Sequence, residues 1–182
     1  MAIAKKKKRF FDAEIPLIGK TTHLIAFELK ELEGRTITYD LTRMLKGKNC
    51  LLKTRVYLDG EKATSKPMEF TILPSFMKRV VRKGTNYVED SFVLESKDAK
   101  IRIKPFLVTR RKVSKAVQNA LRKKMSEELT NYAKTKTTEQ IFDDILKNSV
   151  QKDLSIKLKK IYPLSLCEIR DIKVEKELSK KE

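Results

Sequence analysis

Residues 100–125 read KIRIKPFLVTRRKVSKAVQNALRKKM, and the periodicity of the chain changes within them. In the first part every second residue is apolar or proline, as in a strand with one buried face: Ile101, Ile103, Pro105 and Leu107. Beyond it the apolar residues recur every three or four positions, the spacing of a helix face: Val113, Val117, Ala120, Leu121, Met125, Leu129 and Tyr132. The opposite helix face carries Lys112, Lys115, Asn119, Arg122, Lys123 and Ser126. The change predicts a chain that forms a sheet first and adds helices afterwards.

Upstream of this point a period of two predicts more strands. One covers residues 36–41, and a hairpin covers 50–73 with the Asp59-Gly60 pair near its turn. The alternation over 88–94 predicts a strand that precedes 101–107, with Lys97 and Asp98 in the turn between them. Pro105 has no backbone N–H, so the strand that contains it is expected at an edge or to carry a bulge.

Helices are predicted at other places by their spacing and their caps. The segment LPSFMKRVVRKGT favours a short helix that Ser75 caps and Gly84 ends. Two further helices, at about 138–149 and around Leu154–Ile161, follow the long one, before the helix stop at Tyr162-Pro163. Residues 164–174 are apolar and β-branched, which favours a final strand.

These elements predict an α+β fold: a curved, mostly antiparallel or barrel-like sheet with a helical C-terminal half and a disordered basic N-terminal tail. We expect residues 1–12 to be a basic extension and residues 13–182 to form a single globular domain. That domain would be strand-rich to about 109 and helical to about 162, with its last strand at about 164–174.

The charge of the chain points to a polyanionic partner. Lys and Arg number 42 against 24 Asp and Glu, which gives a formal charge of +18 and a pI near 9.9. Residues 1–126 hold 30 of these cations and 13 of the acids, so nearly all of the excess lies there. Such an excess repels itself in the compact state unless an anionic partner is near. The composition therefore favours nucleic acid or an anionic membrane surface.

Three basic clusters without nearby acids are the candidate RNA contacts. They lie in the tail, on the short helix and around the start of the long helix: Lys5, Lys6, Lys7, Lys8, Arg9; Lys78, Arg79, Arg82, Lys83; Arg110, Arg111, Lys112, Lys115, Arg122, Lys123. A single basic cluster is as often just a solvated surface, but an excess on several separate elements is typical of a protein that meets a phosphate backbone from more than one side. Lysine-rich contacts of this kind position a protein on RNA without reading its sequence.

Two aromatic residues follow the basic tail. Phe10 and Phe11 could stack on unpaired bases, as aromatic side chains do in RNA recognition. They could equally anchor the tail to the core. The sequence leaves both alternatives open.

No catalytic, metal or cofactor site is expected. The GKT triplet at Gly19–Thr21 lacks the glycine that a phosphate-binding loop needs five residues earlier, where this chain has Glu14. His23, the one histidine, alternates with apolar residues and is expected in the core or at its rim. The adjacent acids 89–90 and 143–144 diverge along a strand or helix, so neither pair forms a carboxylate clamp. We expect Cys50 and Cys167 to be reduced, buried thiols.

The order of segments resembles the S3Ae family of small-subunit ribosomal proteins of archaea and eukaryotes, called eS1 in the unified naming. The resemblance is carried by KRFFDAEIP, by GRTITYDLT, by the block MKRVVRKGTNYVEDSFVLESKDAKIRIKPFLVTRRK, by ALRKKM and by IYPLSLCEIRDIKV. The chain departs from the family pattern at Phe10-Phe11, where members carry Trp-Tyr, and at ILPS, where they carry a threonine-arginine-acid turn. It ends shortly after Val174 without the tail of eukaryotic members, which favours the archaeal type.

The resemblance implies that Arg79, Arg82 and Lys83, and with them Arg110–Lys112, face small-subunit rRNA. It places members of the family on the platform of the small subunit near the messenger exit. The expected partners are thus small-subunit rRNA, neighbouring small-subunit ribosomal proteins and, near the exit, messenger RNA. No membrane partner and no homo-oligomer is expected, and the expected location is cytoplasmic, in the ribosome.

The function predicted from the sequence is that of a structural, non-enzymatic constituent of the small ribosomal subunit. A free RNA chaperone or a translation factor would use the same basic faces transiently and is the first alternative. A small nuclease is the second alternative, and the absence of a histidine pair or carboxylate clamp in the sequence disfavours it.

Overall fold

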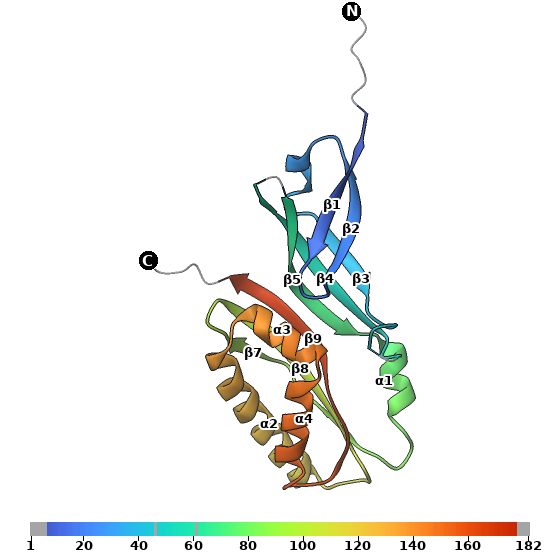
Figure 1. The fold of residues 1–182 in the computed structure, drawn as a ribbon. Coiled ribbons are helices and arrows are strands. Elements are labelled where there is room, and N and C mark those ends of the chain that lie inside the picture. Colours follow the sequence, from blue (N-terminus) through green and yellow to red (C-terminus); the bar gives the residue numbers. More distant parts are fainter. Residues whose placement is uncertain (1–6, 46, 61, 178–182) are drawn as a thin grey trace, which may run out of the picture. The chain divides into compact units, whose positions relative to one another are not determined.

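The computed structural model describes residues 7–45, 47–60 and 62–177 (Figure 1). The chain divides into two compact units, and the single globular domain expected for residues 13–182 stays a prediction. The N-terminal unit takes the chain up to Tyr39 and Leu52–Met68, and the C-terminal unit takes Asp40–Leu51 and everything from Glu69 onward. The expected fold class, α+β with a mostly antiparallel sheet, is confirmed. The sheet is open, so the barrel-like alternative is not realised.

Strands form the N-terminal unit. β1 (Arg9–Ile15) and β2 (Lys20–Ala26) make an antiparallel hairpin, followed by a short 3-10 helix, η1 (Leu29–Leu32), and β3 (Thr36–Asp40). β4 (Cys50–Asp59) and β5 (Lys62–Ile72) are the predicted hairpin, and both strands continue into the C-terminal unit. β1 also pairs with β5 in parallel, at Ala13 with Ala63.

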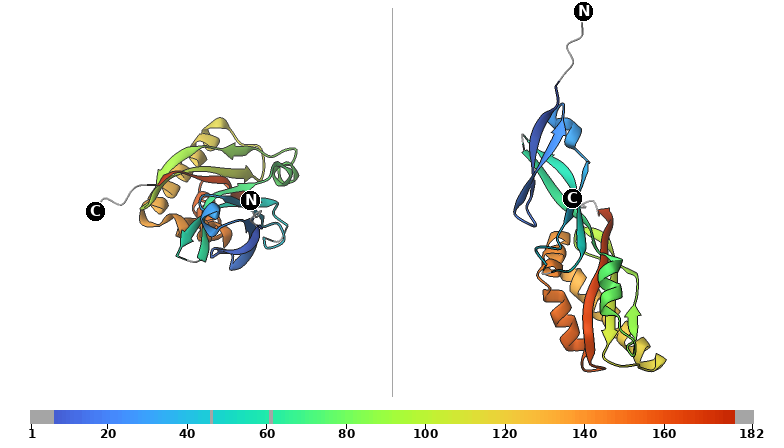
Figure 2. Two further views of the ribbon diagram at one scale, coloured as in Figure 1. Left: turned by 90° about the horizontal axis from the view of Figure 1, so that it is seen from above. Right: turned by 90° about the vertical axis from the view of Figure 1, so that its right-hand side faces the viewer.

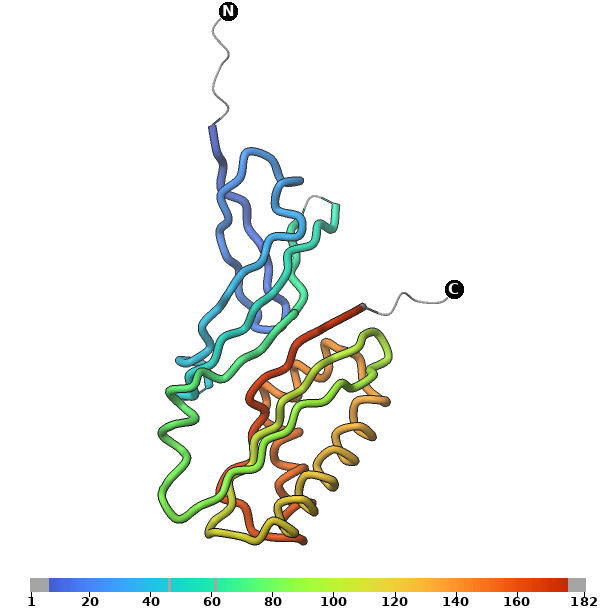
Figure 3. The backbone as a smooth tube through the Cα atoms, turned by 180° about the vertical axis from the view of Figure 1, so that it is seen from behind, coloured from blue at the N-terminus to red at the C-terminus, as the bar shows by residue number. Residues whose placement is uncertain are grey.

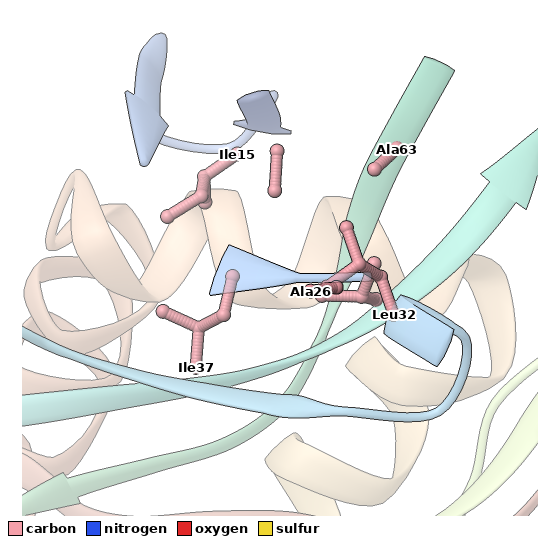
Figure 4. Packing of buried hydrophobic residues seen from close by; sticks show 7 residues of the cluster. Ile15, Ala26, Leu32, Ile37 and Ala63 are labelled. Carbon is pink, nitrogen blue, oxygen red and sulfur yellow. The ribbon is translucent and has the colours of Figure 1, made fainter. Parts of the chain in front are cut away.

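A small apolar cluster holds this unit together. Figure 4 shows its residues, which come from five strands and η1: Ala13, Ile15, Ala26, Leu32, Ile37, Val56 and Ala63. Each is at most 8% exposed. Burial of apolar surface stabilises a folded unit by about 25 cal/mol per Å², so this cluster contributes to its stability.

The buried face of β2 differs from the one expected for His23. The alternation through His23 suggested a buried face of His23, Ile25 and Phe27, but the inward residues of β2 are Leu24 and Ala26. His23 is exposed and pairs with Asp12 on β1, and Ile25 is 48% exposed. Because apolar residues occupy both faces of this strand, a shift of one residue inverts the assignment.

β8 forms the centre of the C-terminal unit. β8 (Ala99–Thr109) pairs along its whole length with β9 (Leu164–Glu177), and its other edge pairs with β6 (Tyr87–Glu89) and β7 (Phe92–Glu95). β9 in turn pairs with the end of β5, at Glu69–Thr71. The expectation that the strand with Pro105 lies at an edge or carries a bulge is confirmed by a bulge at Lys104/Pro105. β6 and β7, predicted as one strand, are separated opposite this bulge.

Three helices pack against this sheet. α2 (Lys115–Thr135), α3 (Thr138–Leu146) and α4 (Ser149–Leu158) lie in front of β8 and β9 in Figure 1 and behind them in Figure 3, and α4 runs beside β9 in Figure 2. The void between α2–α4 and the strands, lined by residues such as Ile101, Leu129 and Ile169, measures only about 10 Å³. A space of that size is at the limit for one water molecule, so it cannot hold a substrate.

The helix boundaries correct three predictions. α1 (Pro74–Val80) begins with Pro74 after the N-cap Leu73, so Ser75 is not its cap, and Gly84 lies in the loop beyond its end. α2 is capped by the Ser114 side chain, so Val113 precedes the helix instead of belonging to its apolar face. Ala120, placed on that face, is exposed, while Leu121, Met125 and Leu129 are buried as predicted.

The joint between α2 and α3 carries a hydrogen-bonded acid. Asp144 accepts hydrogen bonds from Tyr132 Oη and from Lys136 Nζ, the latter at 2.7 Å. The bonds from Lys136 and Tyr132 hold the pKa of Asp144 below its usual value. Burial, together with the hydrogen bond to Asp144, raises the pKa of Tyr132. The ionised form of Asp144 therefore stabilises the folded unit.

We expect Asp144→Asn to lower the melting temperature at neutral pH, by an amount that shrinks as the pH is lowered. A carboxyl whose pKa is depressed by folding contributes stability above its unfolded pKa, and that stability is lost as the pH falls through the folded pKa, from about pH 5 downward. Thermal melts of both proteins between neutral and acid pH measure the difference. Asp153→Asn, a change at an exposed acid of α4, is the control and should show no such convergence.

Candidate nucleic-acid interface

Asn86 holds together the segments that carry two of the predicted basic clusters. Its backbone N–H donates to Thr109 Oγ1 at 3.1 Å, its carbonyl accepts from the Thr109 N–H at 2.9 Å, and its Oδ1 accepts from the Val113 N–H at 2.9 Å. These bonds fix both ends of residues 110–112, which we call the basic loop. The turn between α1 and β6 is thereby tied to the loop that leads into α2.

Thr109 and the residue just before β9 also form hydrogen bonds with this loop. Thr109 is fully buried, and its hydroxyl donates a hydrogen bond to the Arg111 carbonyl at 2.7 Å. The Arg110 N–H donates to the Pro163 carbonyl just before β9, at 3.4 Å. The backbone of the loop is thus hydrogen-bonded, while the side chains of Arg110, Arg111 and Lys112 are exposed. Such a loop presents three cations from a fixed base.

The first turns of α2 and the α1–β6 turn enclose a groove, which we call the Tyr87 groove. Its volume is about 410 Å³, and it is lined by Val81, Thr85, Asn86, Tyr87, Glu89, Lys115, Gln118 and Arg122. Arg82 and Lys83 lie in the turn that forms one wall, and Lys115 and Arg122 lie on the opposite helix. The groove therefore places Lys115 and Arg122 of the third predicted cluster opposite the turn that carries Arg82 and Lys83 of the second.

Most cations on this surface have no counter-charge. Within the described part of the chain, no ion pair involves Lys78, Arg82, Lys83, Arg110, Arg111, Lys112, Lys115 or Lys123, although all are exposed. Arg122 lies 4.0 Å from Asp90, at the limit of an ion pair. Further along α2, by contrast, Lys124 pairs with Glu128 at 3.1 Å and Lys157 of α4 pairs with the same carboxylate at 2.6 Å. Near the start of α2, Lys115 and Lys123 thus lack an ion pair among the described residues, whereas Lys124 of the same helix is paired.

The cations of α1 have one additional structural role. Arg79 donates from its guanidinium to the Gly47 carbonyl at 3.1 Å and lies over the Phe76 ring. Asn49 strengthens the same joint, because its carbonyl accepts from the Leu73 N–H at 2.8 Å. A carbonyl does not neutralise a guanidinium, so Arg79 holds α1 to the 47–49 segment and still adds positive charge to its surface.

The first predicted cluster belongs to the N-terminal unit. Lys5 and Lys6, like the rest of residues 1–6 of the tail expected to be disordered, lie outside the described residues. Lys7, Lys8 and Arg9 are exposed, and Lys8 Nζ lies 5.5 Å from the centre of the Phe27 ring. The expected extension 1–12 is shorter in the structure, because β1 begins at Arg9 and pairs with β2 from that residue.

The two aromatic residues of β1 take different environments. Phe11 is partly buried and packs against the apolar cluster, whereas Phe10 is 72% exposed. Neighbouring residues on a strand point to opposite faces, so one anchors the strand and the other faces solvent. Phe10, Ile25 and Phe27 are the exposed apolar side chains of this hairpin region.

The GKT triplet and the adjacent acids, considered in the sequence as possible phosphate-binding or carboxylate sites, make structural contacts. Gly19, at φ 65°, makes the β1–β2 turn, and Lys20 Nζ lies 2.7 Å from Tyr39 Oη. Glu89 pairs with Arg170 at 3.0 Å, and Asp143 pairs with Lys147. Between residues 7 and 177, apart from 46 and 61, no group of three or more His, Cys, Asp or Glu side chains could hold a metal ion.

Both cysteines are free and buried, as predicted. Burial raises the pKa of Cys50 to about 11 and that of Cys167 to about 12. Only a small fraction of either thiol is therefore ionised at neutral pH, and neither is an activated nucleophile. Among the helices of the described residues, none has the length and apolar character needed to cross a membrane.

Comparison with known proteins agrees with the sequence resemblance. The sequence model of the Ribosomal S3Ae family matches residues 5–177. A protein of Pyrobaculum aerophilum named small ribosomal subunit protein eS1 is 31% identical over 169 residues, which is 90% of this chain and 72% of that protein. Its namesake in Halorubrum lacusprofundi is 26% identical over 183 residues, 94% of this chain and 84% of the relative. The protein of the same name from Methanothermobacter thermautotrophicus is 28% identical over 111 residues, which is 60% of this chain and 57% of that protein.

Proposed function

Because the chain belongs to the Ribosomal S3Ae family, we propose that it is a structural, non-enzymatic constituent of an archaeal small ribosomal subunit that binds rRNA through the basic loop, α1 and the start of α2. The observation that carries the RNA-binding part is the set of exposed cations without counter-charges, held on a hydrogen-bonded framework around Asn86. Unpaired Lys and Arg side chains gain by releasing the counterions of a phosphate backbone. Lys and Arg side chains already paired with carboxylates would first have to break those ion pairs.

The proposed contacts are to the phosphate backbone and shape of the RNA. They are Lys5–Arg9, Lys78, Arg79, Arg82, Lys83, Arg110, Arg111, Lys112, Lys115, Arg122 and Lys123. The basic loop and the Tyr87 groove come from the α1–β6 turn, β6, the loop between β8 and α2, and α2, so one RNA surface would meet four segments of the C-terminal unit. Phosphate contacts made from fixed elements fix position and orientation, which is the contribution that a structural ribosomal protein makes.

The family resemblance further suggests a position on the platform of the small subunit near the messenger exit, among neighbouring ribosomal proteins and close to messenger RNA. The exposed apolar side chains Phe10, Ile25 and Phe27 suit contact with such a neighbour. The cytoplasmic ribosome is the location that goes with this role.

We expect the purified protein to bind structured rRNA fragments with little sequence preference and with an affinity that falls steeply as salt is raised. Each phosphate neutralised adds roughly 0.7 to 0.9 to the slope of log affinity against log salt concentration. Binding of rRNA and of an unrelated structured RNA across a salt series measures this slope. An affinity that does not change with salt would contradict the proposal.

Salt washing of small subunits separates the structural role from that of a free chaperone or translation factor. An integral protein that makes many phosphate contacts should remain on purified subunits at a salt concentration that removes translation factors. Quantifying the protein in the pellet after sedimentation gives the answer. Loss together with the factors would favour the transient role.

A further inference from the structure

The Tyr87 groove combines an exposed aromatic ring with two cations, Lys115 and Arg122. Tyr87 is 54% exposed, although it lies in strand β6 with a buried neighbour, Val88. Its ring stacks on Phe106 of β8, with the ring centres 5.8 Å apart and the planes inclined by 19°. Phe106 is 4% exposed and belongs to the core. The Tyr87 ring is therefore held in place by the core while much of its surface remains open to solvent.

One face of α2 lines the groove opposite this ring. Lys115, Gln118 and Arg122 follow one another at intervals of three and four residues, so they lie along a single helix face. Gln118 is oriented by a bond from its Nε2 to the Val113 carbonyl, at 3.3 Å, which leaves its Oε1 free to accept. The groove thus has a cation at each end of this face and an amide oxygen between them.

Of the two carboxylates near the groove, Glu89 is the one held in a close ion pair. Glu89 lines the groove and is held by Arg170 at 3.0 Å, and Asp90 lies 4.0 Å from Arg122. Glu89 therefore offers a fixed hydrogen-bond acceptor. Because Arg170 offsets its charge, Glu89 repels a bound anion less strongly. Lys115 has no carboxylate partner among the described residues, so positive charge dominates where a phosphate would lie.

These features fit a nucleotide better than a duplex. An aromatic ring can stack on a base only when that base has left its own stack, and an A-form duplex exposes phosphates and sugars but no base face. A groove of about 410 Å³ falls within the range of roughly 300–1,000 Å³ that small-molecule sites occupy. A single nucleotide is a ligand of that size class.

We propose that the Tyr87 groove receives one unpaired nucleotide of the bound RNA, with its base stacked on Tyr87 and its phosphate between Lys115 and Arg122. The inference rests on the proposed RNA-binding function and adds to it a site for an extruded or single-stranded residue. Phosphate contacts at the basic loop would position the RNA backbone, and the stacked base would fix its register.

Because the chain contains no tryptophan, Tyr87→Trp introduces a single tryptophan at the site. We expect a single-stranded oligoadenylate of about ten nucleotides to quench its fluorescence, since base stacking on the ring requires an unpaired base. A blunt RNA duplex of the same length should bind and leave the fluorescence nearly unchanged. Equal quenching by both RNAs, or by neither, would overturn the inference.

Affinities of the full-length protein give the second readout. Tyr87→Ala should weaken binding of the single strand by about 5- to 150-fold, the range that corresponds to loss of one stacked base. It should change duplex binding by less than about twofold, because phosphate contacts dominate there. Tyr87→Phe keeps the ring and should retain the affinity for the single strand, and thermal melts verify that each variant is folded.

The outcomes separate this inference from the proposed function. If the wild-type protein binds neither RNA, the RNA-binding function fails and the groove site fails with it. If the wild-type protein binds both RNAs with a steep salt dependence and Tyr87→Ala binds the single strand as tightly as wild type, only the groove site is refuted.

Discussion

Leu121→Ala is expected to lower the free energy of unfolding by about 2 to 5 kcal/mol, the cost of truncating a buried leucine. Leu121 is 0% exposed and lies on the face of α2 that Met125 and Leu129 continue. Removing its side chain loses transfer free energy and leaves a cavity that the packed surroundings fill only in part.

Chemical denaturation of the wild-type protein and the variant measures this loss. Asn119→Ala, an exposed change two residues away on the same helix, is the matched control and should alter stability by no more than about 0.5 kcal/mol. RNA affinity of the folded Leu121→Ala protein should stay near that of wild type, because the side chain does not reach the basic surface. Equal stabilities for both variants would show that α2 does not pack through Leu121.

The success of the sequence prediction for α2 has a simple physical cause. A helix of six turns that packs on one side must place apolar residues every three or four positions, so Leu121 is predicted inside and Arg122 outside without knowledge of the rest. Val113 failed because the pattern continues past the cap, and Ser114 was the signal that could have placed the start of the helix correctly. Ala120 failed because alanine is common on both faces.

The hairpin β1–β2 shows where a period of two is ambiguous. Leu24 and Ala26 face the core while Ile25 and Phe27 face solvent, and both sets are apolar. Pattern alone therefore supports either register. The parallel pairing of β1 with β5, between residues about fifty positions apart, decides it, and no local sequence window contains that information.

The candidate interface was predictable in its charges but not in its geometry. Each basic residue was visible in the sequence, yet their convergence depends on Asn86, whose side chain reaches Val113, 27 residues later. Tyr87 was also missed as a site residue. The alternation of buried Val88 with its two neighbours could have marked Tyr87 as outward-facing. An exposed aromatic residue beside a basic turn is an uncommon combination, and this could have singled Tyr87 out as a site residue.

Reversing the three charges of the basic loop is expected to have the largest effect on RNA binding. With Arg110, Arg111 and Lys112 all changed to Glu, the slope of log affinity against log salt concentration should fall by about 2 to 3, since each lost phosphate contact removes roughly 0.7 to 0.9. At about 0.1 M salt, one decade below the 1 M reference, the same loss corresponds to an affinity roughly 100- to 500-fold weaker. Folding should be little affected, because Asn86 and Thr109 hold the loop by its backbone and by the Thr109 side chain.

A control variant with an equal change of charge tests whether position matters. Lys97, Lys134 and Lys176 are exposed near the Ala99 end of β8, whereas the basic loop follows its other end, Thr109. Those ends are about 33 Å apart for an 11-residue strand at about 3.3 Å per residue, well beyond the Debye length of roughly 8 Å at physiological salt. Changing these three lysines to Glu should therefore leave the salt slope close to that of wild type. If both triple variants lose the same slope and affinity, binding follows net charge alone, and the assignment of the RNA contact to the surface around Asn86 is wrong.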